Sequence, residues 1–94
     1  MSKTYHVYIL TNYTNNVFYI GITRNIKLRV CQHKLKVADG FTSKYNVNKL
    51  IYAEEYQDIN EAIRREKQLK NWHRQWKINL IKEKNPKFEE ILLN

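Results

Sequence analysis

A glutamate on the apolar side of a helix-like segment is the side chain that most directly suggests chemistry in this sequence. Glu66 follows Ala62 by four residues and precedes Leu69 by three, so the three share one side of a helix. Burying a carboxylate is costly unless a positive group meets it. Two interpretations stay open: an ion pair with one of the 17 Lys and Arg side chains, or a divalent metal ligand. Mg²⁺ often takes only one or two protein carboxylates and fills its shell with water and phosphate oxygens, so a lone glutamate suits phosphodiester chemistry.

An arginine and a histidine form a second candidate element. Arg29 and His33 are four residues apart, which makes their side chains neighbours on a helix. Arginine keeps its charge and binds phosphate oxygens in pairs. The same spacing also fits a solvated basic face. Cys31 lies between them in the sequence but on another side of the helix, and we expect it to pack against the protein.

Two tyrosines, Tyr8 and Tyr19, occupy strand-like segments. Aromatic residues are common in strands for reasons of packing alone. A phenol with a pKa near 10 is a poor base in water. A nearby metal ion and an arginine would favour the phenolate, which can accept a proton from water. The two phenols are therefore either strand aromatics or parts of a reactive centre.

A hairpin must position these two rings. The segments Tyr5–Leu10 and Val17–Ile22 are rich in β-branched and aromatic residues, and the turn-rich stretch Thr11–Asn16 separates them. Residues opposite one another in an antiparallel pair point to the same face. A loop with an even number of residues pairs even positions with odd ones, which puts Tyr8 and Tyr19 on one face. An odd loop or a bulge would separate them.

A helix and a third strand are expected to follow the hairpin. Thr23 or Asn25 can cap a helix that starts near Ile26. Residues that suit its buried side recur at helical spacing at Ile26, Val30, His33 and Val37. The stretch Ala38–Asn48 is predicted to be a loop and Lys49–Tyr56 a strand.

Two further helical segments complete the pattern. Asp58, with Glu61 three residues later, has the form of a capping box. The apolar side of the first segment comprises Ile59, Ala62, Ile63, Leu69 and Trp72, and that of the second, about His73–Lys84, comprises Trp76, Leu80 and Ile81. Asn85-Pro86 ends the second segment, because a residue before proline disfavours the helical conformation.

Composition sets the class of molecule. The chain has 94 residues, 43% of them hydrophobic, which suits one small domain with a modest core. Its net charge of +8, from 17 basic and nine acidic residues, attracts polyanions such as nucleic acid. One cysteine excludes an internal disulfide and a Cys-rich zinc site, and it suits a cytoplasmic protein. The apolar runs are too short for a membrane span, and no signal peptide is evident.

Basic and aromatic side chains are interleaved between Arg64 and Lys77. This combination suits contact with phosphates together with stacking on bases, although a solvated helix surface explains it as well. The expected nucleic-acid contacts over the whole chain are Arg24, Lys34, Lys44, Arg64, Arg65, Lys67, Lys70, Trp72 and Arg74.

The order and spacing of these residues resemble the GIY-YIG nuclease superfamily. The first motif here is His6-Val7-Tyr8, which keeps only the tyrosine, and the second, Tyr19-Ile20-Gly21, is intact. Eleven residues separate the two tyrosines and ten separate Tyr19 from Arg29, as in that family. The segment "REKQLK", Arg65–Lys70, resembles the helix that carries the family's metal-binding glutamate. The later "HRQWKINLI" and "NP" resemble the small stand-alone bacterial members, of the UPF0213 type.

The resemblance implies a fold and an activity. The expected fold is α/β of the α+β kind: a small three-stranded antiparallel β-sheet flanked by helices, in a single domain over residues 1–94 with a core at about 4–86. The expected activity is that of a hydrolase, a metal-dependent endonuclease that cleaves phosphodiester bonds in DNA with one Mg²⁺ or Mn²⁺ ion.

The resemblance also implies roles for individual residues. Tyr8 would be the general base or orient the water, and Tyr19 would assist by hydrogen bonding. Arg29 would steady the charge that develops on the phosphate. Glu66 would hold the metal ion, and His33 would assist in proton transfer or phosphate contact. Further candidates for the site are Thr23 and Asn85, the latter as a match to a late asparagine of the family.

A non-catalytic alternative stays open at this point: a basic nucleic-acid-binding module on the same fold. A pure binder would show salt-dependent affinity and no metal-dependent product. DNA repair in the bacterial cytoplasm is one setting for either function. The sequence leaves RNA as a substrate, the choice between a sequence and a structure as the target, and the oligomeric state open.

Overall fold

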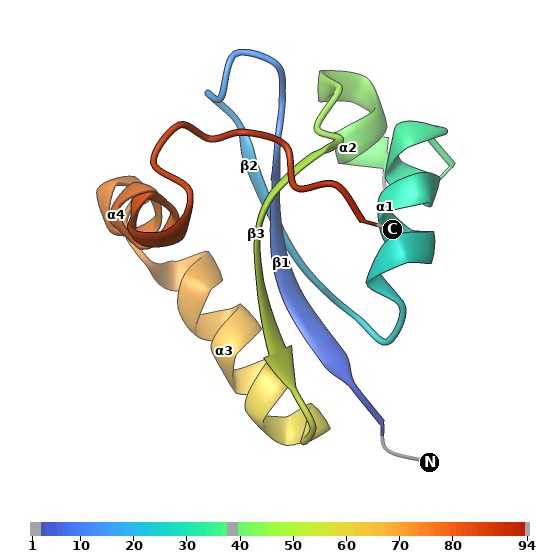
Figure 1. Cartoon of the computed structure of the whole chain (residues 1–94), viewed down its shortest axis with the longest axis vertical. Helices are drawn as coiled ribbons and strands as arrows, with labels where there is room; N and C mark the ends of the chain where they lie inside the picture. The colour runs from blue at the N-terminus through green and yellow to red at the C-terminus, as the bar shows by residue number, and fades with distance from the viewer. Residues whose placement is uncertain (1–2, 38–39, 94) are drawn as a thin grey trace.

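The computed structural model describes residues 3–37 and 40–93. Three strands and four helices lie in this part of the chain (Figure 1). In chain order they are β1 (Tyr5–Thr11), β2 (Phe18–Thr23), α1 (Ile26–Lys34), α2 (Gly40–Tyr45), β3 (Lys49–Tyr56), α3 (Ile59–Asn71) and α4 (Arg74–Lys84). The predicted α+β class with a three-stranded sheet is confirmed. No helix of the described residues is long and apolar enough to cross a lipid bilayer.

The sheet is antiparallel throughout, with β1 between β2 and β3. Thr11 pairs with Phe18, so the hairpin loop has six residues, an even number. Asn12 orders this loop, because its side-chain oxygen accepts hydrogen bonds from the backbone N–H groups of Asn16 and Val17. The predicted parity is therefore correct, and the even positions of β1 share a face with the odd positions of β2.

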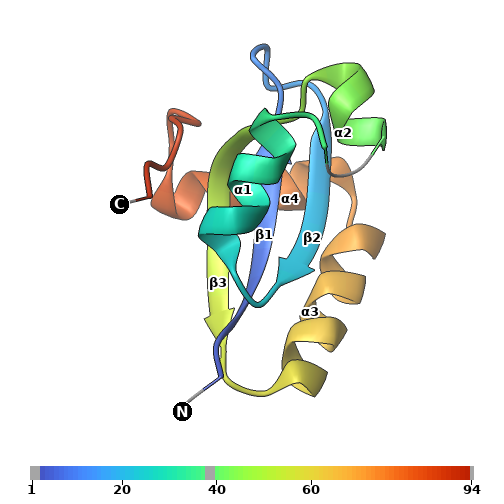
Figure 2. The same cartoon turned by 90° about the vertical axis from the view of Figure 1, so that its right-hand side faces the viewer.

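Helices cover both faces of the sheet, α1 and α2 on one side and α3 and α4 on the other (Figures 1 and 2). The core under α3 and α4 includes Val7, Ile9, Ile20, Ile51, Ala62, Leu69 and Ile81. The core under α1 includes Tyr8, Leu10, Val30, Val47 and Leu50. In Figure 2, α1 crosses in front of the sheet while α3 lies beyond β2, against which it packs.

The third helix forms where the sequence predicts it, although Ile59 and Ile63, expected on its apolar side, are 38% and 37% exposed. Asp58 caps it, because its carboxylate accepts from the backbone N–H of Asn60. Ala62 and Leu69 are wholly buried against the sheet. Trp72 adopts an extended conformation, which ends α3 and lets α4 leave in a new direction.

The chain after α4 folds back over β3. Asn85 ends α4 as predicted, and its side-chain amide donates hydrogen bonds to the carbonyls of Ile51 and Glu89. Further on, the backbone N–H of Ile91 donates to the carbonyl of Leu50. The C-terminal segment is thereby attached to the outer side of β3.

Three local predictions around α1 are wrong. Val37 was expected on the helix, but α1 ends at Lys34 and Lys36 turns the chain with a positive φ of 61°, which leaves Val37 exposed. Cys31 was expected to pack and is exposed, because α1 faces the sheet with Val30 and His33 instead. The predicted loop Ala38–Asn48 contains the short helix α2, and its first two residues lie outside the described residues.

Candidate active site

Tyr8 and Gly21 make the closest approach in the hairpin. They are directly paired across β1 and β2. A Cβ atom added to Gly21 would lie 2.4 Å from the hydroxyl oxygen and 2.5 Å from Cζ of Tyr8. The tyrosine ring therefore lies across the backbone of the glycine, and a larger residue would displace it. The glycine of the Tyr19-Ile20-Gly21 motif thus sets where the Tyr8 hydroxyl can be.

The Tyr8 hydroxyl belongs to a buried polar chain. It lies 3.2 Å from Nε2 of His33, whose Nδ1 lies 2.9 Å from the hydroxyl oxygen of Thr42. All three side chains are almost completely buried. With the imidazole proton on Nδ1 and directed at Thr42, Nε2 accepts a hydrogen bond from the phenol. Such an arrangement places a base directly on the Tyr8 proton.

Tyr19 completes an aromatic cluster with these groups. Its ring centroid is 6.4 Å from that of Tyr8 and 5.5 Å from that of His33. Tyr19 is half-buried, whereas Tyr8 is only 2% exposed. The structure thus brings together the two tyrosines and the histidine singled out from the sequence, and Tyr19 is the phenol nearer to solvent.

Arg29 lines a hollow of about 540 Å³ at the end of α1. Arg24, Thr23 and Asn25 line it as well, with apolar walls from Tyr5, Ile22 and Ile59. Asn25 caps α1 by accepting from the backbone N–H of Leu28, and its own backbone N–H donates to the Thr23 hydroxyl. The guanidinium groups of Arg24 and Arg29 and the positive N-terminal end of α1 favour an anion here, so we name it the phosphate hollow.

Glu66 lies on the sheet-facing side of α3, between Ala62 and Leu69, with 16% of its side chain exposed. Its ion-pair partner among the described residues is the ammonium of Lys70, 3.6 Å away and one helical turn on. The ion pair considered from the sequence is thus present, although this distance exceeds that of a hydrogen bond. Ala62 and Leu69, which flank Glu66 on α3, belong to the core on one face of the sheet, whereas Tyr8 belongs to the core on the other.

Helix α3 contributes to the phosphate hollow and also carries Glu66. Ile59, a wall of the hollow, begins α3, and Glu66 follows seven residues later. Seven residues are two helical turns, so both residues lie on one side of α3 and about 10 Å apart along its axis. Of the other candidates, Thr23 lines the hollow, whereas Asn85 lies on the outer side of β3.

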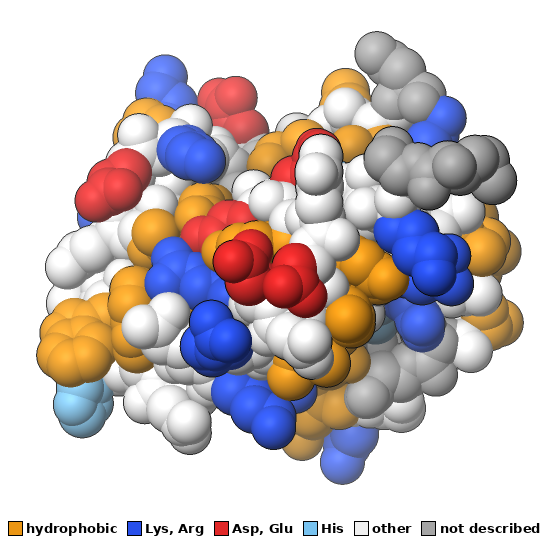
Figure 3. All heavy atoms as spheres, turned by 90° about the horizontal axis from the view of Figure 1, so that it is seen from below, with side chains coloured by type: hydrophobic (Ala, Val, Ile, Leu, Met, Phe, Trp, Pro, Cys, Tyr) orange, Lys and Arg blue, Asp and Glu red, His pale blue; other side chains and the backbone are white. Residues whose placement is uncertain are grey.

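The predicted nucleic-acid contacts differ in their exposure and in their contacts with other side chains of the protein. Arg24, Lys44, Arg64, Lys67, Lys70 and Arg74 are exposed. Lys34 pairs with Glu90 of the C-terminal segment. Trp72 packs against the core with the Arg65 guanidinium 5.1 Å from its ring centre. Seen from the end where α3 begins, Lys and Arg side chains are spread over the surface, with acidic side chains between them (Figure 3).

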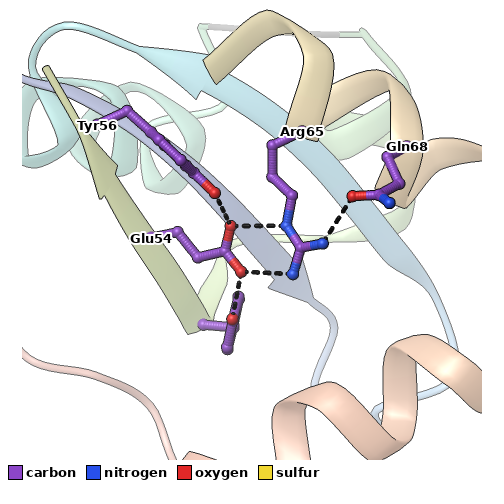
Figure 4. A network of polar contacts seen from close by, with 5 residues as sticks. Glu54, Tyr56, Arg65 and Gln68 are labelled. Carbon is purple, nitrogen blue, oxygen red and sulfur yellow. Dashed lines mark hydrogen bonds and ion pairs between the residues drawn. The ribbon is translucent and has the colours of Figure 1, made fainter. Parts of the chain in front are cut away.

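A carboxylate that the sequence reasoning did not select holds a polar network between β3 and α3 (Figure 4). Glu54 on β3 accepts hydrogen bonds of 2.8 Å from Nε and Nη2 of Arg65, and further ones from the hydroxyls of Tyr52 and Tyr56. Gln68 accepts from Nη1 of the same arginine. The network fixes Arg65, the residue directly before Glu66, against the sheet.

The electrostatics of this network follow from its contacts. Burial disfavours the charge on Glu54, but the hydrogen bonds from Arg65, Tyr52 and Tyr56 outweigh it and hold the pKa of Glu54 below its ordinary range. Burial, together with the neighbouring carboxylate, raises the pKa of Tyr56 to about 12. One signal could have revealed the network: Tyr52, Glu54 and Tyr56 alternate along a strand and so share a face.

The geometry can now be set beside known proteins. Residues 4–79 match the family model described as the GIY-YIG catalytic domain. The chain belongs to the GIY-YIG domain family. The match includes Tyr8, Tyr19, Arg29 and Glu66 and ends before Asn85. This is a nuclease-type family whose substrates are nucleic acids and whose nucleases generally depend on a divalent metal ion.

Relatives within the GIY-YIG family carry the UPF0213 name. The UPF0213 protein SH2523 of Staphylococcus haemolyticus is 33% identical over 84 residues, which cover 89% of this chain and 100% of that protein. A UPF0213 protein of Staphylococcus aureus is 29% identical over 79 residues, covering 84% and 96%. The solution structure of the UPF0213 protein BH0048 of Bacillus halodurans superposes with a TM-score of 0.59 at 24% identity, over 92% of this chain and 90% of that one, and supports the fold.

The donor set fits a metal ion of the kind that this family uses. Within residues 3–37 and 40–93, no three His, Cys, Asp or Glu side chains gather as a ready metal cage. Glu66 is a partly exposed carboxylate whose one cationic partner is beyond hydrogen-bond distance. A hard divalent ion that keeps most of its water needs no more than one such carboxylate from the protein.

Proposed function

We propose that this chain is a metal-dependent endonuclease that hydrolyses phosphodiester bonds in DNA. The observation that carries the proposal is the Tyr8 hydroxyl, held 3.2 Å from Nε2 of a buried histidine and fixed by the glycine of an intact second motif. Packing alone would not require a phenol at this position, since a phenylalanine would fill the same space.

Each protein group has a defined task in this proposal. Arg29 binds the phosphate that is to be cleaved and offsets the charge that develops on its oxygens. Tyr19, the more accessible phenol, orients the attacking water, and Tyr8 takes the proton of that water while its own proton moves to His33. Thr23 contributes a hydroxyl to the wall of the phosphate hollow. Asn85 is bound to the carbonyls of Ile51 and Glu89, and its proposed part is to hold the C-terminal segment.

Glu66 would hold one Mg²⁺ or Mn²⁺ ion, which supplies charge stabilisation at the leaving oxygen when bound. Glu66 would give up its ion pair with Lys70 to hold the ion, and the exposed lysine would then turn toward solvent or phosphate. The Arg65 clamp on Glu54 fixes the turn of α3 from which Glu66 projects.

The DNA backbone would be met by exposed cations around the phosphate hollow and along α3. The proposed contacts are Arg24, Arg64, Lys67, Lys70 and Arg74, together with Lys34 at the end of α1 and Lys44 in the last turn of α2. Such contacts weaken steeply with salt. The proposed setting is a bacterial cytoplasm, because the relatives are bacterial proteins, and the proposed role is DNA repair.

A second candidate function is a basic nucleic-acid-binding module without activity. It is favoured by one observation: Glu66 pairs with Lys70 and lies in the layer opposite the tyrosines. A module of this kind would bind DNA or RNA and leave it intact.

A cleavage panel separates the two functions. Single-stranded, duplex and branched DNA and the corresponding RNA forms are incubated with Mg²⁺, with Mn²⁺ or with chelator. The endonuclease cuts at least one DNA form only when the metal is present, and Arg29→Ala lowers that rate by about 10²–10³-fold. Lys82→Ala, which removes an exposed cation of α4 outside the proposed contacts, is the control and lowers it far less. Salt-sensitive binding without metal-dependent product over hours would establish the binding module instead.

A further inference from the structure

A hollow at the bend between α3 and α4 has the chemistry of a small aromatic slot. Its volume is about 300 Å³, and its walls are Trp72, Trp76, Asn79, Leu80 and Glu83. The two tryptophan rings stand at 87° to each other with centroids 5.9 Å apart, so they form a corner. None of these five residues lines the phosphate hollow at the end of α1.

The two tryptophans differ in how much surface they offer. Trp72 packs on the core, and the Arg65 guanidinium lies 5.1 Å from its ring centre. Trp76 is 51% exposed, with His73 against it at 4.9 Å and 88°. Figure 3 shows a histidine against exposed hydrophobic surface at its left edge, the side on which α4 lies in Figure 1. Trp72 thus forms a fixed wall, and Trp76 is the aromatic that a ligand can reach.

The rim of the slot carries one hydrogen-bond donor and one acceptor. Asn79 uses its side-chain oxygen to accept from Gln75 at 3.0 Å, which leaves its NH₂ group as a donor. Glu83 is exposed, and among the described residues it joins no ion pair. A flat ring with polar groups on its edges suits these walls. Cytosine, adenine and guanine carry an exocyclic amino group that can donate a hydrogen bond to a carboxylate, whereas thymine has no such group.

Two basic side chains stand near the start of α4, the helix that carries four of the five slot residues. Arg74 and Lys77 are neighbours on α4, and within the part of the chain that the structure describes neither has an acidic partner. Partial burial and, after it, the charge of Arg74 lower the pKa of Lys77. A phosphate between them would relieve their repulsion.

A basic path joins the slot to the phosphate hollow. Ile59 at the start of α3 lines the hollow, and Trp72, directly after the last residue of α3, lines the slot. The 13 residues of α3 span about 20 Å. Exposed Arg64, Lys67 and Lys70 recur along it every three residues. At about 3.4 Å per nucleotide of a stacked strand, this length corresponds to about six nucleotides.

We propose that the slot at the α3–α4 bend binds an unpaired nucleobase, stacked on Trp76, of a strand whose backbone follows α3. The inference rests on the proposed nucleic-acid substrate but not on cleavage. A base inside a continuous duplex cannot enter such a slot without leaving its stack. The preferred substrates are therefore single-stranded or branched forms, and bases with an exocyclic amino group bind better than thymine.

Fluorescence without metal tests the slot independently of any cleavage. The chain has two tryptophans, so Trp72→Phe leaves Trp76 as the sole reporter. Single-stranded 12-nucleotide oligonucleotides of cytosine or of thymine, and a mixed-sequence duplex, are titrated at low salt. We expect the cytosine strand to quench Trp76 most and the duplex to quench it least. Should Trp72→Phe fail to fold, the difference between wild type and Trp76→Phe gives the same signal.

Three substitutions sharpen the test. Trp76→Ala should weaken single-strand binding about 5- to 150-fold, the range expected for one stacked base, and change duplex affinity less than about twofold. Tyr13→Ala, which removes a 92% exposed aromatic in the hairpin loop, is the matched control and should leave both unchanged. Glu83→Gln should reduce the preference for cytosine over thymine.

The outcomes separate this inference from the proposed endonuclease. Equal quenching by duplex and single strands, or equal losses in Trp76→Ala and Tyr13→Ala, would overturn the slot. A protein that binds single strands through Trp76 but never cuts would support the slot and refute the endonuclease. Metal-dependent cleavage of a duplex, with no change in Trp76 fluorescence on binding, would support the endonuclease and refute the slot.

Discussion

Replacing Glu54 by glutamine should destabilise the fold far more than replacing Glu66 by glutamine. Glu54 is the acceptor for the Arg65 guanidinium and for two phenols, and only 13% of its side chain is exposed. Glutamine turns an NH₂ group toward one of these donors and leaves the buried positive charge of Arg65 without its partner. Glu66, in contrast, has one partner, Lys70, which is 54% exposed.

The expected size of the effect follows from these contacts. Hydrogen bonds to charged groups contribute about 1.5–3 kcal/mol each, and removing one partner of a buried ion pair costs about 3–5 kcal/mol. Because Arg65 and Glu54 are partly solvated, we expect Glu54→Gln to lower the free energy of unfolding by about 3 kcal/mol. Glu66→Gln should lower it by less than about 1 kcal/mol, as for other exposed pairs. For a chain of this size the first change lowers the Tm by about 12–24 °C.

Urea and thermal unfolding at pH 7, followed by far-UV circular dichroism, measure both variants. A double-mutant cycle with Arg65→Gln should give a coupling energy of at least about 1 kcal/mol, because the two side chains share two hydrogen bonds. If Glu54→Gln unfolds within 1 kcal/mol of wild type, or if the cycle shows no coupling, the clamp does not hold α3 and the reasoning is refuted.

The remaining predictions concern pH and the hairpin. The pKa of Glu54 is depressed below its ordinary 4.5, so its contribution is complete above pH 4.5 and is lost as acid protonates it; Glu54→Gln should flatten this acid limb of stability. The pKa of Tyr56 is raised to about 12, so its contribution is lost between pH 10 and about 12, and Tyr56→Phe should remove that alkaline loss in unfolding titrations. Gly21→Ala should cost about 1–3 kcal/mol in urea unfolding, because its Cβ would meet the Tyr8 ring; an unchanged midpoint would contradict the close approach. Tyr8→Phe should keep the circular dichroism spectrum and lower cleavage about 10²–10⁴-fold, and full activity would exclude the Tyr8–His33 pair from proton transfer.

The hairpin and the inward side of α3 were predictable from local sequence. Strand alternation predicted that Tyr8 and Tyr19 share one face if the loop had an even number of residues, and the six-residue loop meets that condition. The helical period likewise placed Glu66 between Ala62 and Leu69. Both predictions depend only on the geometry of one element or of one pair of elements.

Predictions that depend on how elements pack in three dimensions fared differently. Cys31 was assigned to packing, but the exposed side of α1 is decided by where the sheet lies. The helix α2, which supplies Thr42 to His33, is only six residues long and has no apolar periodicity to reveal it. Which tryptophan is covered, Trp72 or Trp76, is decided by the bend after α3 and by Arg65.

The order of the motifs along the chain likewise does not reveal that α3 and the tyrosines lie on opposite faces of the sheet. The sequence located the individual groups on their elements. How far Glu66 lies from the two tyrosines, and so how both could reach one bound phosphate, depends on how α3 packs against β2 (Figure 2).

Single-turnover cleavage by wild type, Glu66→Ala and Glu61→Ala tests the central claim most directly. The two glutamates lie on the same helix, but Glu61 is exposed in its first turn and Glu66 faces the sheet. On the DNA form that wild type cuts best, with Mn²⁺ in excess, Glu66→Ala should yield no product above the chelator control while it still binds that DNA and unfolds near the wild-type midpoint. Glu61→Ala should cut at close to the wild-type rate. Wild-type cleavage by Glu66→Ala would show that this carboxylate does not hold the metal ion and would contradict the proposed centre.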